Sequence, residues 1–105
     1  MFNINKLSKD QSIHFIGIGG IGLSAMAKLC KSMGYSVQGS DIVENDMTRS
    51  LQENNIKIFI GHNSGNIQKN IHLVVFSSAI SVENPEFIAA KKANISNILR
   101  FTNDD

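Results

Sequence analysis

The sequence predicts an α/β fold of three layers, in which helices cover both faces of a five-stranded parallel sheet. Runs rich in β-branched residues alternate along the chain with segments of helical periodicity, which is typical of strand–helix–strand units with right-handed crossovers. A glycine-rich stretch joins the first such run to the first helical segment. The length of 105 residues leaves room for one domain, at roughly 100–200 residues per domain.

The first strand and the first helix flank the glycine-rich stretch. Residues 12–19 carry the dense β-branched and aromatic side chains of a strand buried on both faces. Apolar residues then follow helical spacing over residues 23–33, with Ser24 and the lysines on the opposite, polar face. Gly34 supplies a stop for this helix, and residues 35–40 form a second strand.

A short helix and a third strand come next. Asn45 or Asp46 can cap the helix, because their side-chain oxygens accept hydrogen bonds from free N–H groups of a first turn. The helix is expected to bury Met47 and Leu51. Residues 56–60 have the β-branched composition of the third strand.

The following segment contains the most apolar strand and the last helix. Residues 63–70 are polar and hold at most one weak helical turn, around Ile67. Residues 71–76 are the strongest buried-strand run in the chain. The Asn-Pro-Glu sequence at 84–86 combines an N-cap, a proline at the first helical position and an acidic first turn, so a helix should run to about Ala93.

The end of the chain contains a fifth strand. Residues 95–99 can form it, although Ser96 and Asn97 weaken the pattern. The predicted divisions of the chain are a polar leader at 1–11, a domain at 12–100 and a C-terminal tail at 101–105.

The glycine-rich stretch has the pattern of a Rossmann-like nucleotide site. Gly17-x-Gly19-x-x-Gly22 lies at a strand-to-helix junction, and Asp41 ends the next strand, 19 residues beyond Gly22 (41 − 22). A Cβ at the closest glycine would keep a diphosphate from the backbone, while the helix that begins near Gly20 offers unpaired N–H groups and its positive dipole end. Asp41 is placed to accept hydrogen bonds from ribose hydroxyls. The alternative is that the glycines only permit a tight turn and close helix packing.

The same stretch can be compared with a second kind of phosphate site, because Gly17 and Gly22 also have the spacing of a P-loop. A P-loop continues with Lys and Ser or Thr, whereas this sequence continues with Leu23 and Ser24. Since no lysine is present to reach the terminal phosphates, an ATP-hydrolysing loop is not expected.

Further polar residues follow the third and fourth strands. Ser77, Ser78 and Ala79 come directly after the fourth strand, at the edge where open α/β sheets bind ligands, and are candidates for ligand contact or for ordinary turn capping. His62 follows the third strand at the same edge, as a candidate ligand contact or an exposed loop side chain. Three residues are expected to be structural: His14, His72 and Cys30.

Composition excludes several classes of function. The chain has a formal charge of +1 and 18% charged residues, without the basic excess of a nucleic-acid-binding protein. One cysteine cannot form an internal disulfide and favours a reducing cytoplasm. We find no apolar run of signal-peptide or membrane-span length and no metal-ligand spacing, so a cytoplasmic protein with neither membrane partner nor metal is expected.

Several motifs occur in the order found in a known family. These motifs are His14–Ser24, Gly34-Tyr35, Gly39–Asp41, Gly61-His62, Ser77–Ile80 and Asn84–Glu86. From about His14 to Arg100, the sequence resembles the N-terminal domain of the Mur ligase family of bacterial peptidoglycan synthesis. Its Gly-Gly-Ile-Gly loop is more similar to the alanine-adding branch than to the muropeptide-recycling branch.

The resemblance implies that this fold binds the UDP part of UDP-N-acetylmuramate. The backbone groups that would hold the diphosphate are those of Gly19, Gly20, Ile21 and Gly22. The residues that would line the uridine and sugar side are Asp41, His62, Ser77, Ser78 and Ala79. Arg100 matches a family arginine just after the last strand.

The resemblance also implies that substrate binding and catalysis belong to different domains. In the complete ligase, ATP with Mg²⁺ phosphorylates the muramate carboxylate, and the amine of L-alanine attacks the acyl phosphate. Family members carry this chemistry on a central ATPase domain and a C-terminal domain, which are expected to be missing here. The 105 residues are therefore expected to bind substrate, with no catalytic residue and no bound cofactor of their own.

Two other functions fit the glycine-rich stretch. One is an NAD(H)-binding Rossmann domain of a dehydrogenase or a redox-sensing regulator, because the loop and Asp41 equally permit it. The other is a stand-alone nucleotide-sensing module. Dinucleotide binding gives no reason for the Gly61-His62 and Ser77–Ile80 segments to match the ligase family.

Overall fold

The computed structural model describes residues 11–95 and 97–102. The predicted leader up to residue 10, Ser96 and the tail from residue 103 lie outside the described residues. The elements are β1 (Ser12–Ile16), α1 (Ile21–Ser32), β2 (Ser36–Asp41), α2 (Asp46–Glu53), β3 (Lys57–Ile60), the 3₁₀ turn η2 (Ser64–Asn66), β4 (Ile71–Ser77), α3 (Pro85–Lys92) and β5 (Asn97–Phe101).

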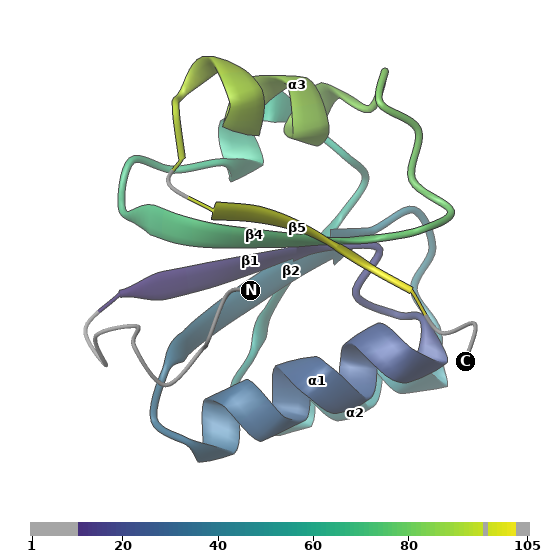
Figure 1. Ribbon diagram of the computed structural model, residues 1–105. Helices are drawn as coiled ribbons and strands as arrows, with labels where there is room; N and C mark the ends of the chain where they lie inside the picture. Colours follow the sequence, from purple (N-terminus) through teal and green to yellow (C-terminus); the bar gives the residue numbers. More distant parts are fainter. Residues whose placement is uncertain (1–10, 96, 103–105) are drawn as a thin grey trace.

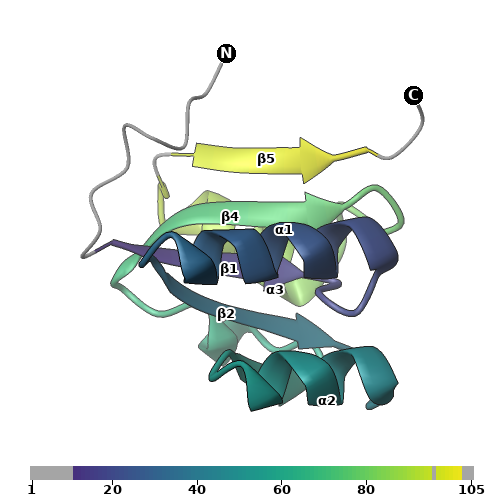
Figure 2. The ribbon, with the colours of Figure 1, turned by 90° about the horizontal axis from the view of Figure 1, so that it is seen from below.

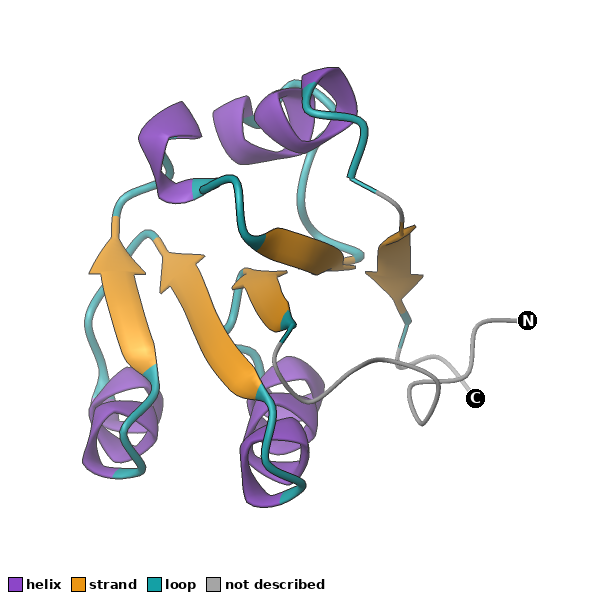
Figure 3. Cartoon of the chain, turned by 90° about the vertical axis from the view of Figure 1, so that its left-hand side faces the viewer, coloured by secondary structure: helices purple, strands orange, loops and turns teal. Residues whose placement is uncertain are grey.

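Five parallel strands form the middle layer in the order β3-β2-β1-β4-β5. Helices α1 and α2 cover one face, and α3 with η2 covers the other (Figure 1 and, edge-on, Figure 3). Viewed from the α1 side, α1 lies over the centre of the sheet and α2 lies beside it, toward β2 and the edge strand β3 (Figure 2). The predicted three-layer α/β class and five-stranded parallel sheet are confirmed.

Two strands, β1 and β5, differ from the prediction by more than one residue. β1 ends at Ile16, because Gly17 has a φ of +85° and turns the chain. β5 covers Asn97–Phe101 and not residues 95–99, so Phe101, which was predicted to begin the tail, pairs with Ser77 of β4. Asn97 therefore sits inside a strand despite its low β-propensity, since pairing with β4 overrides local preference.

The helix signals were mostly correct. Asn45 caps α2 through a capping box with Thr48, and Leu51 is fully buried, while Met47 is only half-buried. α3 begins as predicted, with Asn84 as its N-cap and proline in its first turn.

One residue of α1 departs from the prediction, although the helix begins near Gly20 as expected. It starts at Ile21, with Gly20 as its N-cap. Ser24 was predicted on the polar face but is buried, and its hydroxyl donates to the carbonyl of Ile21. Cys30 is buried on this helix, and burial raises the pKa of its thiol, as expected of a structural residue.

Each face of the sheet has its own core. On the α1 and α2 face, Phe15 of β1 and Leu51 of α2 are fully buried in one apolar cluster. On the α3 face, a smaller cluster surrounds Val74 and Ala90. Over β1 and β2, this second face is polar, because His14, Ser40 and Glu86 are also fully buried there.

Candidate functional site

The candidate site lies where the chain changes direction across the sheet. After β1 the chain crosses to β2 on one side, whereas β4 lies on the other side of β1, so the loops after β1 and β4 diverge from neighbouring strands. Open α/β sheets bind ligands at such a point, beyond the carboxyl ends of the strands. Here the two loops border a pocket of about 190 Å³, which is lined by Gly20, Ile21, Gly22, Leu23, Ser77, Ser78 and Phe101.

The glycines of this loop are present for different structural reasons. Gly17 needs its positive φ, and a Cβ on Gly19 would lie 2.7 Å from the Asp41 carboxylate. Gly20 has an ordinary extended backbone, with φ −67° and ψ 153°, and a Cβ there would meet only the carbonyl of Gly17, at 3.6 Å. Neither backbone strain nor packing requires glycine here; Gly20 suits the N-cap of α1, and its lack of a Cβ also leaves room for close approach of a ligand.

The backbone donors of the loop divide into engaged and free groups. The N–H of Gly19 donates to Asp41 Oδ2 at 2.8 Å, and the N–H of Gly20 donates to the Gly17 carbonyl at 3.2 Å. Within the described residues, the N–H groups of Ile21, Gly22 and Leu23 donate to no acceptor, and no side chain caps α1. The N–H groups that are free to bind an anion therefore lie in the first turn of α1. Of the four residues predicted to hold the diphosphate, only Ile21 and Gly22 have a free N–H group.

Asp41 at the end of β2 faces this loop. Its Oδ2 accepts from Gly19 and its Oδ1 accepts from the N–H of Ile42 at 2.8 Å. The carboxylate therefore braces the turn that precedes α1, and it does not line the 190 Å³ pocket.

The segment after β4 supplies the opposite wall of the pocket. Ser77 accepts a hydrogen bond from the N–H of Ala79 at 3.2 Å, while Ser78 and Ala79 are exposed. Arg100 is exposed on β5 between Leu99 and Phe101, whose side chains pack on the α1 face, so strand alternation directs it toward the α3 face. Arg100 therefore does not line this pocket.

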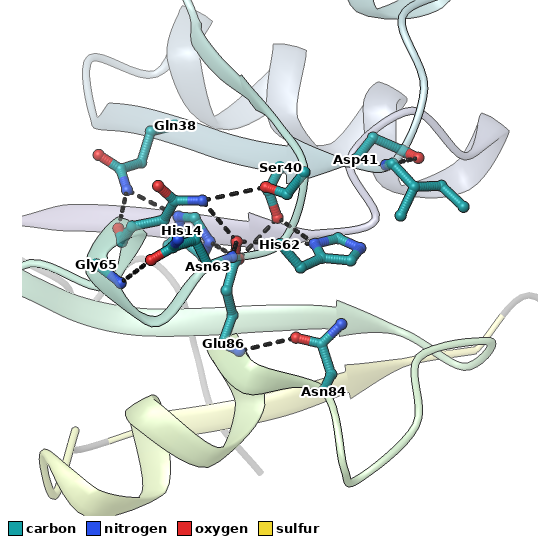
Figure 4. A network of polar contacts seen from close by, with 12 residues as sticks. His14, Gln38, Ser40, Asp41, His62, Asn63, Gly65, Asn84 and Glu86 are labelled. Atoms are coloured by element: carbon teal, nitrogen blue, oxygen red, sulfur yellow. Dashed lines mark hydrogen bonds and ion pairs between the residues drawn. The ribbon is translucent and has the colours of Figure 1, made fainter.

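His62 lies at a second part of the same edge, beyond β3. It lines a broader cavity of about 480 Å³ with the end of β3 and the segment from Gly61 to Asn66. Its ring is 11% exposed, and its Nδ1 lies 2.9 Å from the hydroxyl of Ser40 and 3.7 Å from Oε2 of Glu86. It is neither an exposed loop residue nor a free one, because a buried polar network holds it (Figure 4).

Glu86 is the centre of that network and is the residue that the sequence did not reveal. Its place in the first turn of α3 predicts an exposed charge that favours the helix dipole, but its side chain is fully buried. Burial would raise the pKa of Glu86, but hydrogen bonds from His14 and Ser40 lower it from 4.5 to about 2. The Asn84–Glu86 motif was the sequence signal that could have indicated a role for Glu86. Helix capping accounts for this motif locally, so it did not suggest a distant partner.

The described residues around the glycine-rich stretch do not fit ATP with Mg²⁺. Leu23 stands where a P-loop has its lysine, and the Ser24 hydroxyl is buried against the Ile21 carbonyl, where it cannot reach a metal. Among the described residues, no three His, Cys, Asp or Glu side chains gather as metal ligands. No helix in that part of the chain has both the length and the apolar character needed to cross a bilayer.

Sheet order, glycine-rich turn and pocket define the class of protein: an α/β domain of Rossmann-like topology with a pocket at its topological switch point, where such folds bind ligands. The sequence matches the family described as "Mur ligase family, catalytic domain" over residues 12–101. The chain belongs to the Mur ligase family.

Several relatives of the chain are UDP-N-acetylmuramate–L-alanine ligases. The protein of that name from Blochmanniella floridana is 50% identical over 97 residues, which cover 92% of this chain and 20% of the relative. The one from Rickettsia typhi is 52% identical over 89 residues, which cover 85% of this chain and 18% of the relative. The chain thus spans about a fifth of the length of these curated relatives.

Solved structures agree with the fold. A UDP-N-acetylmuramate-alanine ligase from Thermotoga maritima superposes with a TM-score of 0.80 at 38% identity, over 85% of this chain and 20% of that one. A Neisseria ligase named for UDP-N-acetylmuramate and a tripeptide superposes with a TM-score of 0.78 at 20% identity, over 87% of this chain and 28% of that one. The second likeness concerns the fold only.

Proposed function

We propose that this domain binds the UDP moiety of UDP-N-acetylmuramate and serves as the substrate-recognising part of an ATP-dependent ligase that adds L-alanine to that substrate. The observation that carries the proposal is the pocket at the switch point, where free N–H groups of α1 face the serine segment after β4. Two peptide donors and a helix dipole can hold a diphosphate without a basic side chain. The near-neutral charge of the chain is consistent with such a site.

The remaining parts of the proposal concern the complete enzyme. ATP, Mg²⁺ and L-alanine would be bound by the parts of the ligase that correspond to the remaining four fifths of its relatives, because the chain spans about a fifth of their length and its glycine-rich stretch does not fit ATP with Mg²⁺. Asp41 would contribute by holding the glycine-rich turn, and His62 by facing the uridine or sugar. Peptidoglycan precursors of this kind are made in the bacterial cytoplasm, which is where we place the protein.

An NAD(H)-binding domain is the second candidate, because in dinucleotide sites an acid at the end of the second strand accepts hydrogen bonds from the ribose. Each oxygen of Asp41 accepts one backbone N–H group, from Gly19 and from Ile42, and keeps a second acceptor position. Asp41 therefore permits this candidate too, and it is the family match over residues 12–101 that favours the uridine ligand.

Titration calorimetry of the purified chain decides between the two. UDP-N-acetylmuramate and UDP are expected to give saturable heats, whereas NADH is expected to give none. Saturable NADH binding without a response to either uridine ligand would overturn the proposal.

A further inference from the structure

The buried carboxylate of Glu86 has every acceptor position filled. Oε1 receives His14 Nε2 at 2.6 Å and the Ser40 hydroxyl at 2.7 Å. Oε2 receives the backbone N–H of Asn63 at 3.0 Å and Asn66 Nδ2 at 2.8 Å. An ionised carboxylate accepts about four hydrogen bonds, so this side chain is an acceptor in all its contacts.

The network fixes which nitrogen of His14 carries a proton. Gln38 Nε2 lies 3.0 Å from the carbonyl oxygen of Asn66 and 2.8 Å from His14 Nδ1. Only the amide nitrogen can donate to that carbonyl, so its second proton goes to Nδ1. His14 is therefore neutral, with its proton on Nε2 and directed to Glu86.

The same reasoning reaches His62 through Ser40. A serine hydroxyl has one proton, and the Ser40 proton goes to the Glu86 carboxylate, which has none to give. Ser40 Oγ must then accept from His62 Nδ1, which lies 2.9 Å away, so Nδ1 carries the proton. Nε2 of a neutral His62 is left as a bare acceptor, and Figure 4 shows this second ring nitrogen pointing away from Glu86.

We propose that Glu86 is a positioning residue: acting through Ser40, it fixes His62 with its proton on Nδ1, so that Nε2 accepts a hydrogen bond from an N–H or O–H group of the bound nucleotide sugar. The inference rests on the proposed function. It assigns His62 to the uracil imide or a sugar hydroxyl and not to the diphosphate, because a bare nitrogen and a phosphate oxygen are both acceptors. The diphosphate is left to α1.

Oε2 of Glu86 supports this role by holding the chain around His62. Asn63 follows His62 directly, and its N–H is tied to the carboxylate. Asn66 closes the segment, because its Nδ2 donates to Glu86 and, at 3.3 Å, to the Gly61 carbonyl. One side chain on α3 thus sets both the backbone position and the proton of a residue that follows β3.

Nitrogen NMR of the imidazole rings in the free protein tests the inference directly. At about pH 8, above the ordinary pKa of histidine, the signals should report His62 protonated on Nδ1 and His14 protonated on Nε2. His62 protonated on Nε2 would overturn the proposal, and this measurement needs no variant.

Glu86→Gln is the informative substitution. Its amide can satisfy Asn63 and Asn66 only by turning its oxygen toward them, which places its NH₂ group against Ser40. The same NH₂ group would also face His14 Nε2, which would lose its acceptor. Ser40 would then donate to His62, whose proton should move to Nε2, and affinity for UDP-N-acetylmuramate should fall about tenfold. Glu83→Gln removes a like charge from an exposed position just before α3 and should change neither tautomer nor affinity.

The outcomes separate this inference from the proposed function. If the wild-type chain binds no uridine ligand, the proposed function fails, while the tautomers measured on the free protein still test the network. If Glu86→Gln moves the His62 proton and leaves affinity unchanged, the assignment of Nε2 to the ligand is wrong.

Discussion

The substitution Gly20→Val tests whether glycine is present at this position for ligand binding or for the backbone conformation. Gly20 has φ −67° and ψ 153°, a conformation that valine adopts readily, and a Cβ there meets the Gly17 carbonyl at 3.6 Å, an ordinary contact. Replacing glycine by an apolar residue at an N-cap costs on the order of 0.5–1 kcal/mol, which the lost freedom of the unfolded chain partly offsets. The free energy of unfolding should therefore change by less than about 1 kcal/mol.

The effect on binding should be much larger. The isopropyl group would project at the pocket mouth and hold the diphosphate away from the N–H groups of Ile21 and Gly22. Hydrogen bonds to a charged group contribute about 1.5–3 kcal/mol each, so loss of two costs at least about 3 kcal/mol. Affinity for UDP and for UDP-N-acetylmuramate should then fall by more than about 100-fold.

Urea unfolding and titration calorimetry measure the two effects in one protein. Ala25→Val is the matched control, because it places the same side chain on an exposed position of α1 about one turn further along. It should leave affinity unchanged. If a folded Gly20→Val protein kept uridine-ligand affinity within a few-fold of wild type, the placement of the diphosphate at this loop would be refuted.

Three further predictions concern stability. The folded-state pKa of Glu86, about 2, lies below its ordinary 4.5, so the ionised side chain stabilises the fold fully above pH 4.5. As pH falls toward 2, about 3 kcal/mol of the free energy of unfolding should be lost. Urea midpoints across this pH range test the prediction, and a flat profile would contradict it. In Gly39→Ala the new Cβ would overlap Ile18 Cδ1 and lie 2.7 Å from the Phe15 carbonyl, so the free energy of unfolding should fall by about 1–3 kcal/mol. A melting temperature equal to wild type would count against this packing. Asn45→Ala removes the α2 cap and should cost about 1 kcal/mol by urea unfolding, whereas no change would mean that the capping box is not formed in solution.

Local signals predicted the elements well and their partners poorly. Asn45 and the Asn84-Pro85 pair act within their own helices, so their roles can be inferred from neighbouring residues. β5 was misplaced by two residues, because its register depends on β4 and not on its own composition.

In the candidate site, too, local features could be predicted and long-range contacts could not. The glycine-rich turn is local, and Ile21 and Gly22 indeed carry free donors, with Ser77 and Ser78 across the pocket from them. Glu86 was missed because its partner His14 is 72 residues away, and a buried polar contact at that separation depends on how the sheet and α3 pack. Its first-turn position already had a sufficient local explanation.

An amide NMR titration of the chain with UDP-N-acetylmuramate tests the placement of the ligand most directly. We expect the largest shifts at Ile21, Gly22 and Ser78, around the 190 Å³ pocket at the carboxyl edge of the sheet. A larger cavity, of about 270 Å³, lies at the opposite edge between Lys69 and Asn94. Shifts confined to that opposite cavity, or no shifts at saturating ligand, would show that the ligand does not bind at the predicted pocket.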